Sequence, residues 1–321
     1  MIRRILCTLL IVPGLFLISC LKEEIPIDQP DPGDVVQNSY KMGTDYRMNS
    51  YYDIQTNSFV KEHLKTDWDL GFETGTNGWR IVLNTSKAMA AGEAPNADFI
   101  AVVDTIGVEW RNDAPSWNLD STAIGDWQQF GGTYCIDRGF SFDGTHQGYR
   151  KMAILSVDDY HYEIRFANMD GSDEVTVEIP KSDDNFNFAF FSFETNNLVD
   201  IEPEKETWDL VFRQYTHIFD GHTPYLVTGV LSNTNNVEVA EVFSKPFEQV
   251  TFDDIATSNF RADIDVIGYD WKTFNGSGFE THSEQVYIVK TTEGLYYKLR
   301  FVDFYNSQGD KGTPTFEVQA L

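Results

Sequence analysis

"TDWDLGF" at residues 66–72 and "ETWDLVF" at residues 206–212 are two versions of one strand in a chain of 321 residues. In both, Trp, Leu and Phe alternate with other residues, which is the two-residue period of a half-buried β-strand. Large aromatic side chains in such strands are usually core residues. The repeat therefore predicts that Trp68 and Trp208 lie buried at equivalent places.

Further blocks repeat in the same order along the chain. "YYDIQTNSFV" at 51–60 aligns with "FFSFETNNLV" at 190–199, "MAILSVDDYHYEIRF" at 152–166 with "YIVKTTEGLYYKLRF" at 287–301, and "VTVEI" at 175–179 with "PTFEV" at 314–318. Such self-similarity indicates an internal duplication. Since the repeated blocks have strand periodicity, we predict an all-β protein with two tandem domains at residues 36–180 and 181–321.

The N-terminus has the features of a lipoprotein leader. Arg3 and Arg4 precede a short apolar run that ends in "LISC", which resembles a lipobox. We predict a signal peptide at residues 1–19, lipidation of Cys20 and a proline-containing tether at residues 20–35. "LKEE" after Cys20 resembles an export signal of surface lipoproteins. These features predict an outer-membrane lipoprotein, displayed on the cell surface and held by its lipid anchor.

Charge and cysteine content restrict the function further. The chain has 24 Lys and Arg against 50 Asp and Glu, a formal net charge of −26. This charge repels phosphate backbones, so we expect no nucleic-acid partner.

The cysteines and the motifs of the chain also bear on its function. Cys7 is removed with the signal peptide and Cys20 is lipidated, so Cys135 remains as a free thiol without a disulfide partner. Motifs of the common hydrolases and phosphate-binding loops are missing from the sequence, and we expect a binding protein, not an enzyme.

The repeated blocks resemble the HmuY family of haem-binding surface lipoproteins. The resemblance is carried in the second copy by "FSFETNNLV", "TWDLVFRQY", "YIVKTTEGLYYKLRFVDFY" and "KGTPTFEV", and more loosely by the first copy. It implies tandem HmuY-like β domains that hold haem between side chains from loops. It also implies delivery of haem to an outer-membrane haem receptor.

The iron ligands do not transfer from the family to this chain. The resemblance implies an axial His shortly after a Trp-x-x-Phe segment. Here Trp271-Lys272-Thr273-Phe274 is followed by Asn275-Gly276, and the first copy has Gly131-Gly132 after Phe130. His146 and His282 each follow a Thr in a Gly-containing loop of their own copy. We therefore predict that these two loops meet and supply a bis-His haem site.

Other groups leave alternatives open. His217 and His222 in "THIFDGH" form an i, i+5 pair that is a second candidate metal site. Trp79, Trp110 and Trp117 have no equivalent in the second copy, and are candidates for a stacking surface for a sugar or a planar ligand. The alternative function is accordingly a glycan- or protein-binding surface lipoprotein that has lost its haem site.

Overall fold

The computed structural model describes residues 32–96, 98–181, 183–243 and 245–321. The predicted signal peptide, Cys20 and the tether up to residue 31 lie outside the described residues. Nearly all regular structure is β-strand, so the prediction of an all-β protein is confirmed. In the part described, no helix is long and apolar enough to cross a membrane.

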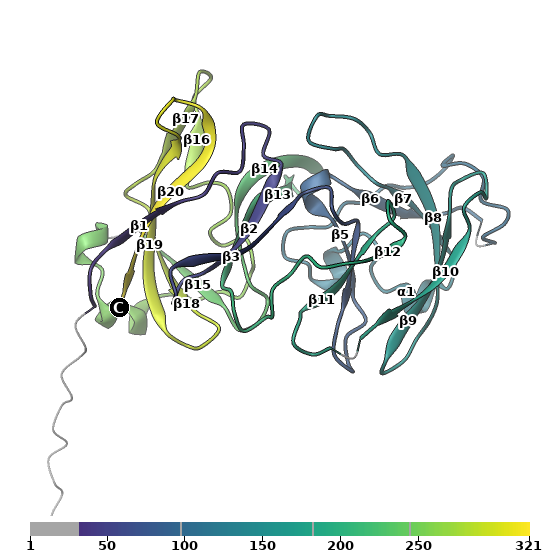
Figure 1. Ribbon diagram of the computed structural model, residues 1–321, viewed down its shortest axis with the longest axis horizontal. Coiled ribbons are helices and arrows are strands. Elements are labelled where there is room, and N and C mark those ends of the chain that lie inside the picture. Colours follow the sequence, from purple (N-terminus) through teal and green to yellow (C-terminus); the bar gives the residue numbers. More distant parts are fainter. Residues whose placement is uncertain (1–31, 97, 182, 244) are drawn as a thin grey trace, which may run out of the picture. The chain divides into compact units, whose positions relative to one another are not determined.

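Two five-stranded antiparallel sheets make up much of the fold (Figure 1). The first has the order β10-β9-β8-β7-β6, with strands β6 (Ala90–Glu93), β7 (Thr133–Asp137), β8 (Tyr149–Val157), β9 (His161–Ala167) and β10 (Val175–Pro180). The second has the order β1-β20-β19-β18-β15, with strands β1 (Val36–Ser39), β15 (Glu238–Val242), β18 (Val286–Lys290), β19 (Tyr296–Tyr305) and β20 (Lys311–Ala320).

Two four-stranded sheets and a small hairpin complete the strands. One sheet, β12-β11-β4-β5, contains β4 (Leu70–Glu73), β5 (Ile81–Leu83), β11 (Phe188–Ser192) and β12 (Asn197–Val199). The other, β14-β13-β2-β3, contains β2 (Met48–Asp53), β3 (Ser58–Leu64), β13 (Leu210–Phe219) and β14 (Thr223–Ser232). The hairpin is β16 (Lys272–Phe274) with β17 (Phe279–Thr281).

In the described residues, helical structure is confined to segments of three to six residues. These are α1 (Trp127–Phe130) and the 3₁₀ turns η1 (Thr85–Lys87), η2 (Leu119–Ser121), η3 (Phe247–Gln249) and η4 (Phe252–Thr257).

The two predicted halves exchange hairpins within the four-stranded sheets. β2 pairs with β13, opposing Tyr52 to Leu210, and β11 pairs with β4, opposing Phe191 to Leu70. Figure 1 shows purple β2 and β3 beside green β13 and β14. The predicted boundary at residues 180 and 181 therefore does not separate two independent sets of sheets, because each half lends its first hairpin to the other.

The repeated "WDL" motif holds these exchanged hairpins. The carboxylate of Asp69 accepts a hydrogen bond from Phe193 N at 2.7 Å, and the carboxylate of Asp209 accepts one from Ile54 N at 3.0 Å. Phe193 and Ile54 are equivalent positions of the two aligned hairpins. The same hydrogen bond therefore occurs at equivalent positions of the two halves, as expected after a duplication. The internal duplication stays a prediction, which this reciprocity supports.

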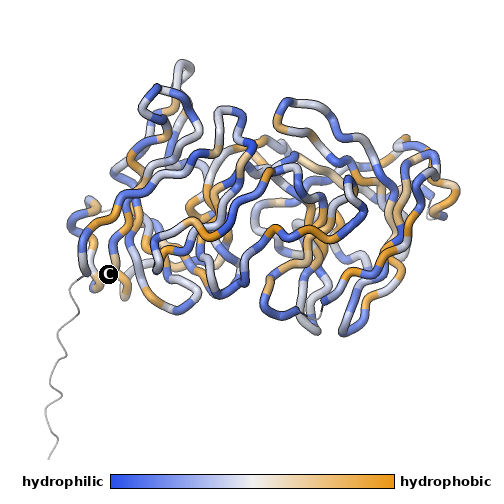
Figure 2. The backbone as a smooth tube through the Cα atoms, in the orientation of Figure 1, coloured by the Kyte–Doolittle hydropathy of each residue, from blue (hydrophilic) through white to orange (hydrophobic). Residues whose placement is uncertain are grey.

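Apolar side chains of the described residues fill three large cores and two smaller clusters. One lies in the first five-stranded sheet with β4 and β5, and another in the second with β2 and β13. The third lies between the four-stranded sheets and contains both Trp68 and Trp208, which are 1% and 6% exposed. The prediction that both tryptophans are buried is confirmed, and they share one core. Figure 2 shows the alternation of apolar and polar residues along the strands that produces these cores.

Candidate functional site

An open groove of about 730 Å³ is lined by residues of the second half of the chain and by Tyr46 of the first. We call it the aromatic groove, because six of its lining side chains are aromatic rings, from Tyr46, Phe219, Tyr225, Tyr269, Phe274 and Phe279. Its volume is that of a typical small-molecule pocket. Tyr225 and Phe274 are 64% and 58% exposed, so large apolar surfaces face solvent there. Contiguous exposed apolar surface of this kind marks a binding site.

Two hairpins build the walls of the aromatic groove. β13 and β14 each run for ten residues, and Tyr225 stands near their turn. In the short β16–β17 hairpin, Phe274 and Phe279 are a cross-strand pair with ring centroids 5.4 Å apart. Asn275 fixes that turn, since its side-chain oxygen accepts hydrogen bonds from Ser277 N and Gly278 N. The rings are therefore held in place before any ligand arrives.

Lys272 is a buried cation in the lining of the aromatic groove. Its Nζ donates to Thr228 O at 2.5 Å and to Tyr269 O at 3.3 Å, and lies 4.0 Å from the Trp271 ring centroid. Burial lowers the pKa of this amine to about 7, although the nearby Asp270 charge acts in the opposite direction. Its two carbonyl partners tie β16 to β14 and to the preceding loop.

His217 and His282 border the aromatic groove. The His217 ring packs 4.7 Å from the ring of Phe219 and 5.0 Å from that of Tyr269, centroid to centroid. Its Nδ1 atom is buried and has no hydrogen-bond partner among the described residues. His282 Nε2 lies 2.8 Å from the hydroxyl of Thr273, a lining residue. One member of each predicted pair therefore contacts a residue that lines the groove, His217 through Phe219 and Tyr269 and His282 through Thr273.

His222, the predicted partner of His217, stands in the exposed turn after β13. Its Nδ1 lies 2.7 Å from Asp220 O. Over the described part of the chain, no group of three or more His, Cys, Asp or Glu side chains is arranged to hold a metal ion. The i, i+5 spacing does not bring a third ligand to the pair.

His146 is occupied by contacts within the first half. Its Nε2 lies 2.7 Å from Asp137 Oδ1, and its Nδ1 accepts a hydrogen bond from Gly148 N at 3.3 Å. Both ring nitrogens are therefore engaged, and neither is free to bind iron. Within the described ranges, no hydrogen bond, ion pair or ring contact joins His146 to His282. The structure therefore does not bring the predicted bis-His pair together, because the two loops belong to different sheets.

The three unmatched tryptophans do not share a surface. Trp79 packs against Trp127, with ring centroids 6.5 Å apart. Trp117 is buried against Phe188. Trp110 alone of the three is exposed, at 38%. The sequence shows that these residues lack a repeat partner, but which of them reach the surface depends on how the long loops fold back.

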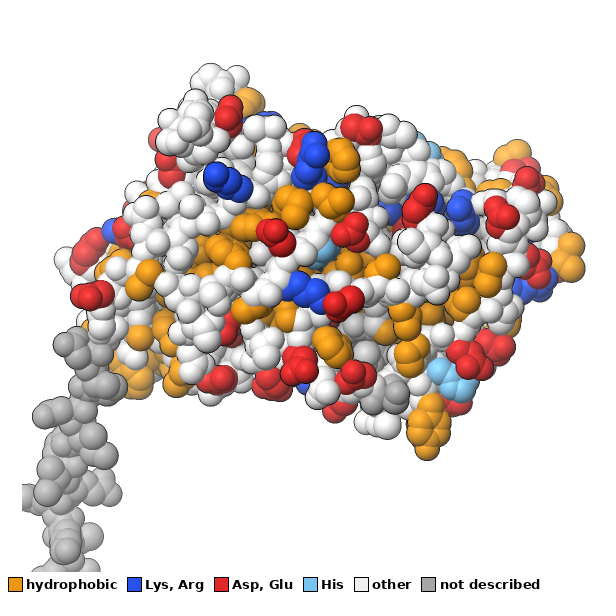
Figure 3. Space-filling model, in the orientation of Figure 1, with side chains coloured by type: hydrophobic (Ala, Val, Ile, Leu, Met, Phe, Trp, Pro, Cys, Tyr) orange, Lys and Arg blue, Asp and Glu red, His pale blue; other side chains and the backbone are white. Residues whose placement is uncertain are grey.

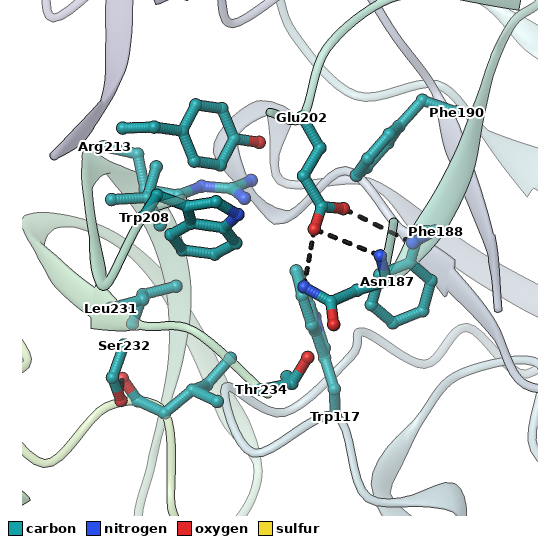
Figure 4. Close-up of a pocket in the computed structure, with 13 residues that line it drawn as sticks. Trp117, Asn187, Phe188, Phe190, Glu202, Trp208, Arg213, Leu231, Ser232 and Thr234 are labelled. Atoms are coloured by element: carbon teal, nitrogen blue, oxygen red, sulfur yellow. Dashed lines mark hydrogen bonds between the residues drawn. The ribbon is translucent and has the colours of Figure 1, made fainter. Parts of the chain in front are cut away.

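A small enclosed cavity lies between the exchanged hairpins (Figure 4). Its volume of about 20 Å³ is the size of one water molecule, so it is not a ligand site. Glu202 accepts hydrogen bonds there from Asn187 N and Nδ2 and from Phe188 N. Burial outweighs these bonds and raises the pKa of the Glu202 carboxyl to about 7.

Cys135 and the surface charge are two further features that the sequence singled out. Cys135 is free and fully buried, and burial raises the pKa of its thiol to about 11, which keeps it protonated and unreactive. Figure 3 shows acidic side chains spread over the visible face, with fewer basic ones. The expected absence of a nucleic-acid partner stays a prediction from this charge.

Residues 184–318 match the model of the HmuY protein family, which confirms the resemblance over that part of the chain. Among curated proteins, none matches the chain. Solved structures similar to it include apo PinO from Porphyromonas gingivitis, with 12% identity, 90% of this chain and 98% of that chain covered, and a TM-score of 0.34. The apo HmuY analog TFO of Tannerella forsythia has 12% identity, the same coverages and a TM-score of 0.32. A putative HmuY-like heme binding protein from Bacteroides vulgatus has 17% identity and a TM-score of 0.20, and the match covers 40% of this chain and 82% of that chain.

Proposed function

We propose that the protein binds haem in the aromatic groove, as a surface lipoprotein that performs no catalysis. The observation that carries this proposal is the position of the groove. It is built around Trp271-Lys272-Thr273-Phe274, the segment beside which the HmuY resemblance implies an iron ligand. Apart from Tyr46, every residue that lines it belongs to the part of the chain that matches the family.

The chemistry of the lining suits a planar, mostly apolar molecule with acidic edges. Rings such as Tyr225 and Phe274 offer apolar surface for a macrocycle. Lys311, whose Nζ lies 5.0 Å from the Tyr46 ring centroid, is positioned at the groove to pair with a carboxylate. When bound, haem would supply an iron centre that takes imidazole ligands.

His217 is the first candidate axial ligand, since its buried Nδ1 has no partner in the described structure. His282 is the second, because only a hydroxyl, that of Thr273, engages its Nε2, and a hydroxyl can rotate away. His146 has no such freedom, because a carboxylate and a backbone amide hold its two nitrogens.

The cellular part of the proposal comes from the leader. Lipidated at Cys20 and displayed on the outer membrane, the chain would pass haem to an outer-membrane haem receptor. Incorporation of labelled palmitate into the wild type and not into Cys20→Ala tests the anchor.

Haem titration of the soluble chain, followed by the Soret band, tests the ligand. Wild type should shift the band, and Phe274→Ala should weaken binding about tenfold by removing an exposed wall of the groove. Replacing His217 by Ala should change the coordination spectrum, because the iron loses an imidazole. His146→Ala is the matched control and should bind as wild type does. A chain that leaves the Soret band unchanged would exclude haem.

A further inference from the structure

A second exposed aromatic surface lies in the first half of the chain, away from the residues that line the groove. We call it the aromatic row, made of Trp110, Tyr149, His146 and Phe140. Neighbouring ring centroids are 5.8, 5.0 and 5.2 Å apart in that order. Trp110, Tyr149 and Phe140 are 38%, 39% and 44% exposed. A contiguous run of exposed rings, unlike a single exposed one, indicates a binding surface.

The aromatic row is held rigidly by the loop between β7 and β8. Phe140 N donates to Lys87 O at 2.8 Å, and Phe140 and His146 form an isolated antiparallel bridge. Gly139 has a φ of +66°, and a Cβ there would lie 2.1 Å from Lys87 O, so only glycine fits. On the other side, Arg111, next to Trp110, exchanges both backbone hydrogen bonds with Ala91. Rings fixed in this way lose little freedom when a ligand binds.

Polar groups lie within the aromatic row. The His146–Asp137 pair sits between the rings of Phe140 and Tyr149, with side chains 32% and 23% exposed. Asp137 Oδ1 accepts from both His146 and Gly139 N, so the carboxylate is oriented and its Oδ2 stays available to a ligand hydroxyl in this arrangement. An apolar peptide or lipid would cover Asp137 Oδ2 without giving it a hydrogen-bond donor, at a free-energy cost.

The ring orientations exclude one flat ligand. Interplanar angles along the row are 36°, 55° and 61°, so no single plane touches all four rings. A rigid macrocycle can lie on one ring only, whereas linked sugar units can turn from ring to ring. A sugar also carries apolar C–H faces for the rings and hydroxyls for Asp137. The excess of acidic side chains disfavours an anionic sugar.

We propose that the aromatic row is a binding site for a neutral oligosaccharide, separate from the haem site. Its anchors are Trp110 and Tyr149, and the Asp137 carboxylate, oriented by His146 and Gly139 N, accepts hydrogen bonds from the sugar hydroxyls.

Native affinity electrophoresis tests this proposal, with dextran, starch, mannan or xyloglucan cast in the gel. At least one of these neutral polysaccharides should retard the wild type, and the acidic polygalacturonate should not. Trp110→Ala and Tyr149→Ala should each weaken retardation at least tenfold. Tyr160→Ala, which removes a 70% exposed ring of the same half outside the row, is the matched control. Thermal unfolding of each variant shows whether the fold is retained.

Three outcomes would overturn the assignment. The first is no retardation of the wild type by any of the four neutral polymers, and the second is equal retardation of the wild type and the Trp110→Ala/Tyr149→Ala double variant. The third is loss of the haem-induced Soret shift in Trp110→Ala. The last result would make the row part of the haem site. If the wild type did not bind haem but were still retarded by a neutral polysaccharide, the proposed function would be wrong and the oligosaccharide site would be supported.

Discussion

At the scale of single residues, buried acids decide how the fold responds to pH. Glu202 and Asp113 accept only N–H donors, and burial raises the pKa of each to about 7. Below its ordinary pKa of 4.5, Glu202 is protonated in both the folded and the unfolded chain. Between 4.5 and 7 the unfolded chain ionises while the folded one holds its proton. Unfolding is therefore favoured increasingly as pH rises through this window.

We expect Glu202→Gln to flatten this dependence. In the window from 4.5 to 7, Glu202 alone should contribute a loss of about 1.4 kcal/mol of stability per pH unit, because the unfolded chain releases a proton that the folded chain keeps on this carboxyl. The loss that Asp113 contributes should remain in Glu202→Gln. Urea unfolding at pH 5 and at pH 8 measures the difference. Glu204→Gln, an exposed neighbour, is the control and should follow the wild type. If Glu202→Gln and wild type lose the same stability between the two pH values, the carboxyl is already ionised in the folded chain.

The residues of the candidate site were only partly predictable from the sequence. Spacing placed His282 in a loop near the Trp-x-x-Phe segment, and the structure puts it beside the groove. The sequence could not show that both nitrogens of His146 are engaged, because Asp137 and Gly148 come within hydrogen-bond distance of them only in the folded loop. The sequence also could not place His217 beside the groove, because its ring packs against Tyr269, which is far from it in the sequence.

At the scale of elements, the sequence predicts strands well and their partners poorly. Alternation in "WDLGF" and "YYDI" identifies β4 and β2, but does not show which strands they join. Since the hairpin β2–β3 resembles β11–β12, either could pair with β4 or with β13. The observed pairs cross between halves, with Leu70 opposite Phe191 and Leu210 opposite Tyr52. Local periodicity is identical in both arrangements, so tertiary contacts select one of them.

Asp69 and Asp209 fix equivalent exchanged hairpins with different electrostatics. Burial alone would raise the pKa of Asp69, but the charges of Lys87 and Arg138 outweigh it and lower that pKa. The Asp69 carboxylate lies 2.5 Å from Lys87 Nζ and 3.2 Å from Arg138 Nε. Asp209 accepts only backbone N–H groups, from Ile54 and Thr292, and burial raises its pKa to about 6.

This difference predicts unequal effects of one substitution. Asp69→Asn should cost about 3–5 kcal/mol at pH 8, because it leaves buried Lys87 without its ion-pair partner and Arg138 with only the exposed Glu194. Asp209→Asn removes a destabilised carboxylate and leaves no buried cation, so it should cost clearly less. Urea unfolding of both variants at pH 8 provides the comparison, and each is the other's matched control. Equal losses would mean that the backbone hydrogen bonds, and not the ion pairs, hold the hairpins.

At the scale of the whole molecule, the hairpin exchange makes the two halves depend on each other. Trp68 and Trp208 share the core between the four-stranded sheets. Across the same region, Lys61 of β3 forms an ion pair with Asp200, which directly follows β12. The N-terminal strand β1 also pairs with β20, near the opposite end of the chain. Each half therefore completes sheets that the other begins.

The last prediction follows from this dependence. Residues 33–181 and 182–321, produced separately, should each fail to fold cooperatively, because β2–β3 lacks β13 and β11–β12 lacks β4. Each fragment would expose the edge of an unpaired hairpin and half of the shared core. Mixed in equal amounts, the fragments should associate and restore a dispersed amide NMR spectrum and the blue-shifted fluorescence of buried Trp68 and Trp208. If residues 33–181 alone gave a cooperative thermal transition, the hairpins would be able to close back within their own half, and the exchange would not be needed for folding.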